Sequence, residues 1–146
     1  LRRINDRHIK CFFFGSGPQH PNYSFTLKQG VVAHHLLPDY LNMSDVFLMP
    51  TLSEGCCNAI IEAMACGLPI ISTDAPFNRD ILNESNSILI KDPLSIDQIQ
   101  KAVLQMYKNP RLRRNLSDGA LASVKNLTLT KRAQRIIDFI HLQQAN

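Results

Sequence analysis

The chain has 146 residues, enough for a single domain over residues 1–146, and its 45% hydrophobic and 19% charged content is ordinary for a soluble globular protein. No apolar run approaches the ~20 residues of a membrane-spanning helix, and the N-terminal residues do not resemble a signal peptide. The formal charge of +4 is divided unevenly, with −3 over residues 1–100 and +7 over residues 101–146.

The charge distribution and the cysteines limit the classes of partner. The basic C-terminal part suits a solvated face or an anionic membrane surface, and its lack of interleaved aromatic residues disfavours nucleic acid. The four cysteines show no C-x-x-C spacing, so we predict no zinc site and no redox pair. We expect reduced thiols in a cytoplasmic protein that can lie at the cytoplasmic face of the membrane. Because the sequence does not begin with methionine, we also expect a piece of a longer protein.

The N-terminal third is typical of alternating strands and loops. Residues 1–8 are expected to end a helix, and the apolar run over residues 9–14 predicts a buried parallel strand. A turn containing Gly15 and Gly17 stops this strand. Residues 25–32 predict a second strand, which brings the segment after it to the same edge of the sheet.

That segment contains His34, His35 and Leu36. Two adjacent histidines are candidate metal ligands, but consecutive side chains point apart and no third ligand is evident. We therefore predict no metal site here.

The central stretch predicts a βαβ unit with parallel strands. After a short helical turn over residues 38–43, a strand begins near Val46 and is stopped by Pro50. The following loop contains Gly55, for which we expect a backbone angle closed to other residues. A strand over residues 70–73 completes the unit.

The helix of this unit is short and mostly buried. Asn58 is its expected N-cap, Gly67 is expected just past its C-terminus, and Pro69 prevents continuation. Between them nearly every side chain is apolar or small, except that Glu62 shares one face with Asn58. An ionised carboxylate is not tolerated in a dry core, so this face should open onto a cleft.

Position and residue type together suggest a ligand. In parallel sheets, ligands bind beyond the carboxyl ends of the strands, where Glu54 and the helix N-terminus should lie. The free amides of a helix N-terminus favour an anion such as phosphate, and Glu54 and Glu62 can accept hydrogen bonds from hydroxyl groups. Phosphate together with hydroxyls describes a nucleotide sugar.

The rest of the chain predicts a strand and several helices. A loop over residues 74–78 precedes a helix that carries Asp80, and residues 87–90 form a further strand. Ser95 is expected to cap a helix that extends to about Met106. Two more helices are expected, over residues 110–124 and 130–142.

These residues resemble the donor-site signature of retaining GT-B glycosyltransferases of sequence family 4, and the resemblance covers nearly the whole chain. Its strongest part is Glu54, Gly55, Asn58, Glu62-Ala63-Met64-Ala65, Gly67 and Pro69-Ile70. The resemblance implies an α/β fold with a Rossmann-like parallel sheet flanked by helices, equivalent to the C-terminal half of a GT-B enzyme without its first strand. It also implies a missing N-terminal GT-B domain.

The same resemblance implies a reaction and its site residues. A sugar passes from a nucleoside diphosphate sugar to a carbohydrate or lipid-linked acceptor with retention, without a cofactor or metal, in cell-surface polysaccharide or glycolipid synthesis. Glu62 would hold the ribose, and Glu54 would hold the donor sugar and take part in catalysis. The remaining substrate-binding candidates are Gly55, Cys56, Cys57 and Asn58 for the diphosphate or sugar, and Gly15, Gly17, His34, His35 and Leu36 around the nucleotide.

Some residues depart from the family pattern, and other functions stay open. His34 stands near a usual glycine, and Pro76 and Phe77 replace paired glycines close to the donor, so no sugar preference can be transferred. A nucleotide-sugar-binding module without activity, or a scaffold fragment, is the alternative to an enzyme.

Overall fold

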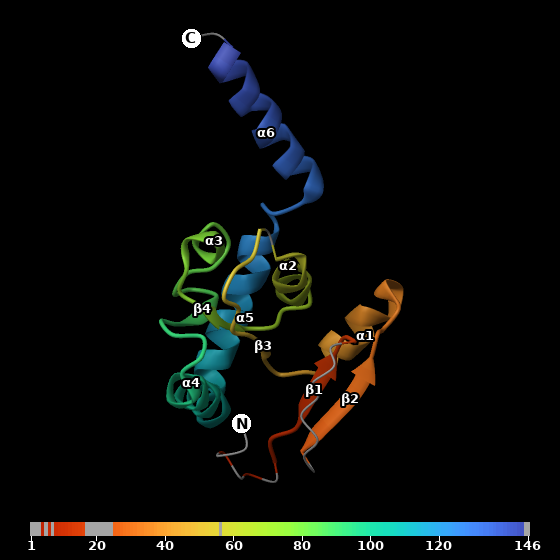
Figure 1. The fold of residues 1–146 in the computed structure, drawn as a ribbon, viewed down its shortest axis with the longest axis vertical. Helices are drawn as coiled ribbons and strands as arrows, with labels where there is room; N and C mark the ends of the chain where they lie inside the picture. The colour runs from red at the N-terminus through yellow and green to blue at the C-terminus, as the bar shows by residue number, and fades with distance from the viewer. Residues whose placement is uncertain (1–3, 5, 7, 17–24, 56, 145–146) are drawn as a thin grey trace.

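The computed structural model describes residues 4, 6, 8–16, 25–55 and 57–144 of the chain (Figure 1). Strands and helices alternate through most of it, as expected for an α/β fold. Most of the expected helix over residues 1–8 lies outside the described residues. The elements are β1 (Cys11–Phe14), β2 (Thr26–Gly30), the 3-10 helix η2 (His34–Leu36), α1 (Leu37–Asn42), β3 (Phe47–Met49), α2 (Asn58–Ala65), β4 (Ile70–Thr73), α3 (Pro76–Arg79), β5 (Ser87–Ile90), α4 (Ile96–Lys108), α5 (Pro110–Val124) and α6 (Leu129–Gln144).

The strands are parallel but form two sheets. β1 pairs with β2, while β3, β4 and β5 form a second sheet in that order. The α/β class with parallel strands flanked by helices is confirmed, whereas the expectation of one sheet is wrong for the described residues. Apolar runs predict strands, but they do not specify which strands pair. An edge-to-face contact between Phe14 and Tyr40, with ring centroids 5.5 Å apart, joins β1 to α1.

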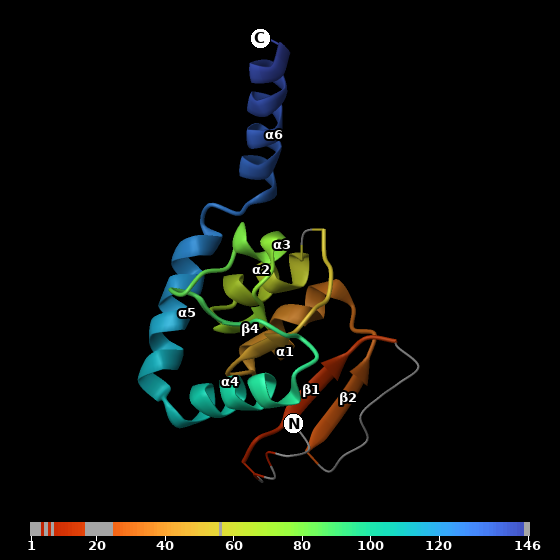
Figure 2. The same ribbon diagram turned by 60° about the vertical axis from the view of Figure 1, so that its left-hand side comes forward.

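β4 lies at the centre of the larger sheet, and all four of its residues are buried. Successive side chains of a strand point to opposite faces, so Ile70 and Ile71 enter different hydrophobic clusters. The Ile70 cluster is covered by α1 and α2, and the Ile71 cluster by α4. α5 contributes Ala120 to the first cluster and Leu116 to the second, and Figure 2 shows it running along one side of the body.

The ends of α2 show why the sequence forms a short helix here. Gly67 has φ 75°, and its amide donates to the Met64 carbonyl while the Leu68 amide donates to Ala63. This pair of bonds is a Schellman motif, so the predicted end is confirmed. The N-cap is Cys57 and not Asn58, which is the first helical residue. The helix therefore begins one residue earlier than expected, at the position that was predicted for its cap.

Several other boundaries agree with the sequence. β4, β5 and α5 have the predicted limits, and the Ser95 hydroxyl accepts from the Gln98 amide at the start of α4. One local prediction is wrong, because Pro76 begins a short helix inside the expected loop over residues 74–78. Asp80 consequently lies just after α3 and not on it.

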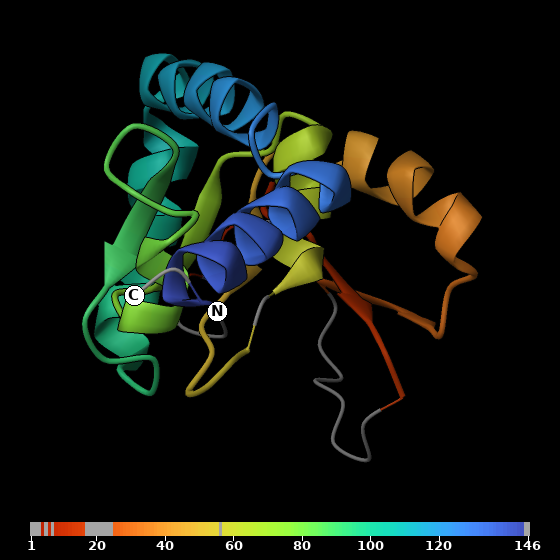
Figure 3. The same ribbon diagram turned by 90° about the horizontal axis from the view of Figure 1, so that it is seen from above.

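The C-terminal helix α6 extends away from the body, as Figures 1 and 2 show, and seen from above it lies in front of the body (Figure 3). None of its residues is buried, and its apolar side chains include the exposed Leu129, Phe139 and Leu142. Two of its cations hold the chain that leaves α5, since Lys131 and Arg135 donate to the carbonyls of Lys125 and Asn126. No helix in the described part of the chain has the length and hydropathy to cross a bilayer.

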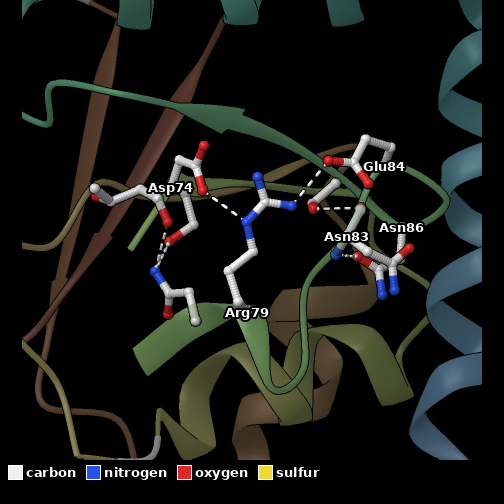
Figure 4. A network of polar contacts seen from close by, with 9 residues as sticks. Asp74, Arg79, Asn83, Glu84 and Asn86 are labelled. Carbon is white, nitrogen blue, oxygen red and sulfur yellow. Dashed lines mark hydrogen bonds and ion pairs between the residues drawn. The ribbon is translucent and has the colours of Figure 1, made fainter. Parts of the chain in front are cut away.

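An ion-pair network ties the loop after β4 to the turn before β5 (Figure 4). The Arg79 side chain lies between two carboxylates, with Nε 2.6 Å from Asp74 Oδ1 and Nη1 2.8 Å from Glu84 Oε1. Hydrogen bonding to Arg79 lowers the pKa of both carboxyl groups. In the same turn, the Asn83 amide donates to Asn86 Oδ1 at 3.0 Å.

A close backbone contact holds α5 against that turn. A Cβ atom on Gly119 would overlap the carbonyl group of Ser85. The adjacent Asn86 is fully buried and donates through Nδ2 to the Ile81 carbonyl and the Ser123 hydroxyl, both at 3.1 Å. Glycine at position 119 therefore permits an approach that no larger residue allows.

We predict that Gly119→Ala lowers the free energy of unfolding by about 1–3 kcal/mol. By helix propensity alone, alanine would raise the free energy of unfolding by roughly 1 kcal/mol relative to glycine. A decrease would therefore be due to the close contact with Ser85. Asp118→Ala, at an exposed position on the same helix, is the control and should stay within about 0.5 kcal/mol of wild type. Urea unfolding measures both, and a Gly119→Ala chain as stable as wild type would contradict the packing.

We also predict that the Arg79 network makes stability depend on acid pH. The lowered pKa values mean that the folded state favours ionised Asp74 and Glu84, so this contribution is present above about pH 4 and is lost as the pH falls through the folded-state values. In Arg79→Gln that part of the pH dependence should disappear. Thermal unfolding from pH 7 to pH 3 should give curves for wild type and variant that converge at low pH. Parallel curves for wild type and Arg79→Gln would rule out the network. Arg111→Gln, which changes another exposed arginine, is the control and should keep the pH dependence of wild type.

Candidate functional site

The candidate site lies at the carboxyl end of β3, in the loop that leads into α2. Two hydroxyls of β4 fix the start of this loop. Ser72 Oγ donates to the Met49 carbonyl and Thr73 Oγ1 donates to the Thr51 carbonyl, both at 2.7 Å. These bonds continue the pairing of β3 with β4 past the last residue of β3, so the loop begins from a rigid base.

A buried side-chain amide donates hydrogen bonds to the Ser72 hydroxyl and to the backbone of Thr73. Asn78, on α3, has no exposed surface, and its Nδ2 donates to Ser72 Oγ at 3.1 Å and to the Thr73 carbonyl at 2.9 Å. Buried polar groups are stable where they have such partners. The sequence analysis did not identify Asn78, and only its position in a loop next to the motif could have suggested it.

Among the residues that the structure describes, no side chain caps the N-terminus of α2. Cys57 occupies the N-cap position without a capping hydrogen bond, and its buried thiol lies 3.3 Å from Met49 Sδ. The Ile60 amide already donates to the Cys57 carbonyl at 3.1 Å, so the first two amides of the helix are the ones that have no acceptor within it. They lie at the positive end of the helix dipole. Asn58, the first helical residue, is exposed. This helix end is therefore suited to an anion.

Glu62 lies on the same helix, and its carboxylate contacts a residue from a distant part of the chain. His34 Nε2 is 2.9 Å from Glu62 Oε1. The His34 side chain is 84% exposed and that of Glu62 is 33% exposed, so this helix face is partly open to solvent. The cleft expected beside it stays a prediction. Sequence analysis identified both residues, but it did not predict that they form a pair.

Glu54 and Gly55 lie between β3 and α2, as expected. Glu54 is half-buried and Gly55 is exposed. The expected positive φ at Gly55 is wrong, because Gly15, Gly30 and Gly67 are the described glycines that adopt one. A Cβ atom on Gly55 would have no heavy neighbour within 4 Å, so the absence of a side chain leaves open space beside the backbone.

The remaining candidates lie at the ends of β1 and β2. Gly15 follows β1 with φ 124°, and its amide already donates to the Gly30 carbonyl at 2.7 Å. His35 and Leu36 are exposed in η2, next to His34. Two predicted site residues, Gly17 and Cys56, lie outside the described residues.

Three observations bear on other kinds of site. Within the residues that the structure describes, no three His, Cys, Asp or Glu side chains gather as metal ligands. A surface hollow of about 280 Å³ is lined by residues such as Asp45 and Gly67, which lie at the amino ends of the strands and thus opposite the candidate site. Burial raises the pKa of the Cys66 thiol, as does the charge of Glu62, so this cysteine is no activated nucleophile.

The arrangement can bind an anion and a group of hydroxyls at the same edge of the sheet. The first amides of α2 can donate hydrogen bonds to an anion. One turn further along the helix, the carboxylate of Glu62 can accept hydrogen bonds from hydroxyls. The half-buried Glu54 adds a second carboxylate in the loop before the helix.

Comparison with known proteins identifies the family of the chain. The profile of the family described as glycosyl transferases group 1 matches residues 21–123, more than half of the chain. A teichuronic acid biosynthesis glycosyltransferase, TuaC of Bacillus subtilis, is 34% identical over 64% of this chain and 24% of its own length. A lipopolysaccharide core biosynthesis mannosyltransferase, LpsB of Rhizobium meliloti, is 28% identical over 70% of this chain and 30% of its own length.

A solved structure extends the agreement to the fold. Anabaena HepE in complex with UDP superposes with a TM-score of 0.78 at 13% identity, over 93% of this chain and 42% of that one. The chain thus spans less than half the length of each of these proteins. It belongs to the glycosyl transferases group 1 family, glycosyltransferase family 4, and corresponds to the C-terminal portion of a GT-B fold.

Proposed function

We propose that this chain is the donor-binding part of a retaining glycosyltransferase and binds a nucleoside diphosphate sugar at the carboxyl end of β3. The observation that carries the proposal is the uncapped N-terminus of α2, with Glu62 on the same helix. A helix end supplies about half a positive charge for the diphosphate, and a carboxylate is a suitable acceptor for the hydroxyls of a ribose.

Each site residue has a role in this proposal. The backbone amides of residues 55–58 receive the diphosphate or the sugar, and Glu62 holds the ribose. Glu54 accepts a hydrogen bond from a hydroxyl of the donor sugar close to the reacting carbon. There its charge also stabilises the positive charge that develops as the bond to the leaving diphosphate breaks. No metal ion is required for these interactions.

The nucleotide base is proposed to lie against the loop before α1. His34, His35 and Leu36 are exposed there, and the loop that contains Gly15 and Gly17 follows the neighbouring strand β1. Because His34 contacts Glu62, this loop lies next to the proposed ribose site. The base and the ribose would then be held by adjacent elements.

The acceptor and the biological context follow from the relatives. TuaC and LpsB are named for teichuronic acid and lipopolysaccharide core synthesis, so we propose a carbohydrate or lipid-linked acceptor in cell-surface polysaccharide or glycolipid assembly. A facing N-terminal GT-B domain completes the site. The chain alone is therefore proposed to bind a nucleoside diphosphate without transferring sugar, and it acts as a non-catalytic binding module until that domain is present.

We further propose that the protein works at the cytoplasmic face of a membrane. The net charge of +7 over residues 101–146 favours an anionic lipid surface, at about 1 kcal/mol for each basic residue near the surface. Lys131 and Arg135 are engaged with backbone carbonyls, so the other cations, such as Arg111 and Arg114, are the better candidates for this contact.

The proposal predicts that Glu62→Gln weakens the binding of the donor and of the free nucleoside diphosphate alike, since both contain the ribose. Loss of a hydrogen bond to a charged group costs about 1.5–3 kcal/mol, or roughly tenfold to hundredfold in Kd. Titration with UDP, GDP and ADP, followed by NMR chemical shifts, measures the effect for weak complexes. Glu84→Gln makes the same chemical change at a carboxylate outside the site and should leave Kd unchanged. Unchanged affinity in Glu62→Gln would remove Glu62 from the ribose site.

Glu54→Gln is predicted to affect turnover much more than nucleoside diphosphate affinity, because Glu54 is assigned to the sugar and not to the nucleotide. The test uses the longer protein with its own N-terminal domain and compares kcat with the Kd for the nucleoside diphosphate. Equal losses in kcat and in affinity would contradict the assignment. If the wild-type protein binds the donor but transfers no sugar to any acceptor, it is a binding module and not an enzyme.

A further inference from the structure

The contact between His34 and Glu62 connects two elements that are distant in sequence and are associated with different sheets. His34 begins η2, which follows β2 in the smaller sheet, whereas Glu62 lies on α2, which packs on the larger sheet. The distance of 2.9 Å between Nε2 and Oε1 is that of a hydrogen bond. A carboxylate has no hydrogen to donate, so His34 Nε2 is the donor.

The position of the His34 backbone depends on the fold and not on this contact. Within η2, the Leu36 amide donates to the Ala33 carbonyl at 2.9 Å. The adjoining helix α1 is fixed by Leu41, which is buried in the same cluster as residues of α2, and by Leu37, which packs against that cluster. The backbone that carries His34 is therefore held beside α2 independently of the side-chain pair.

The contact adds little to the stability of the fold. An exposed ion pair gains little in water, and the His34 side chain is 84% exposed. Its effect is on the orientation of one carboxylate. A bond to Oε1 limits the rotation of the carboxylate plane, and it leaves Oε2 and the second lone pair of Oε1 available to other donors.

We propose that His34 is a positioning residue for nucleotide recognition, which holds the Glu62 carboxylate in the orientation that accepts hydrogen bonds from the two neighbouring hydroxyls of a ribose. This inference rests on the proposed function, because it requires Glu62 to bind ribose. A carboxylate that is already oriented loses less conformational freedom when the ligand binds. His34 thus increases affinity for ribonucleotides without a contact of its own to the hydroxyls.

A double-mutant cycle on the Kd for UDP tests the proposal, with His34→Ala, Glu62→Gln and the double variant of the 146-residue chain. His34→Ala should weaken UDP binding about threefold to fivefold, the size expected of an exposed contact with a carboxylate. In the Glu62→Gln background the same change should have little further effect, because the carboxylate to be oriented is absent. His34→Gln retains an amide donor and should recover most of the affinity. His141→Ala, on the exposed helix α6, removes an imidazole elsewhere and serves as the control.

A second measurement separates orientation from a general structural role. Wild type should prefer UDP over 2′-deoxy-UDP, and His34→Ala should reduce this preference, whereas a loosened fold would weaken both ligands equally. If Glu62→Gln weakens UDP binding but His34→Ala has no effect, or has an equal effect in both backgrounds, the positioning role is refuted and the proposed function stands. If Glu62→Gln itself leaves UDP binding unchanged, the ribose assignment fails and this inference fails with it.

Discussion

The complete burial of β4 is the constraint on which the rest of the structure depends. A strand with both faces covered needs a hydrophobic layer on each side, and Ile70 and Ile71 contribute to the two layers separately. α2 is held on one layer and α4 on the other, while α5 contributes to both. A shift of β4 by one residue would move the Ser72 hydroxyl away from its carbonyl partner and into an apolar layer, so the present register is favoured. That register determines where β3 and β5 end, and hence where the site loop begins.

At the carboxyl end of β4, buried polar residues take the place of the apolar ones. Its last two residues are Ser72 and Thr73, which are buried and bonded to carbonyls at and beyond the end of β3, and Asn78 supports both. A buried hydroxyl without a partner costs free energy, so these bonds oppose any displacement of the loop. The start of the loop that leads to α2 is thereby held in place. This would favour binding of an anion at the N-terminus of α2, where the described side chains do not cap the amides.

Local signals in the sequence were sufficient for most elements and for the identity of the candidate residues. The Ser95 cap, the end of α2 at Gly67 and the apolar runs of β4 and β5 all depend on neighbours within a few residues. The motif around Glu54 and Glu62 indicated the family for the same reason. Features that depend on distant contacts were missed. The sequence does not reveal that β1 and β2 form their own sheet, nor that Gly119 touches the backbone at Ser85.

The separation of the two sheets affects how a bound ligand would change the local stability of β1 and β2. No backbone ladder joins β1 and β2 to the larger sheet in the described residues, so their attachment depends on side-chain contacts such as those of Leu41 and Phe14. Each sheet can then open with its own free energy. A ligand that touches both η2 and α2 binds the closed arrangement in preference to the open one, and at a concentration of 100 Kd it would favour closure by about 2.7 kcal/mol. Amide hydrogen exchange in β1 and β2 would therefore slow on binding, although neither strand needs to touch the ligand.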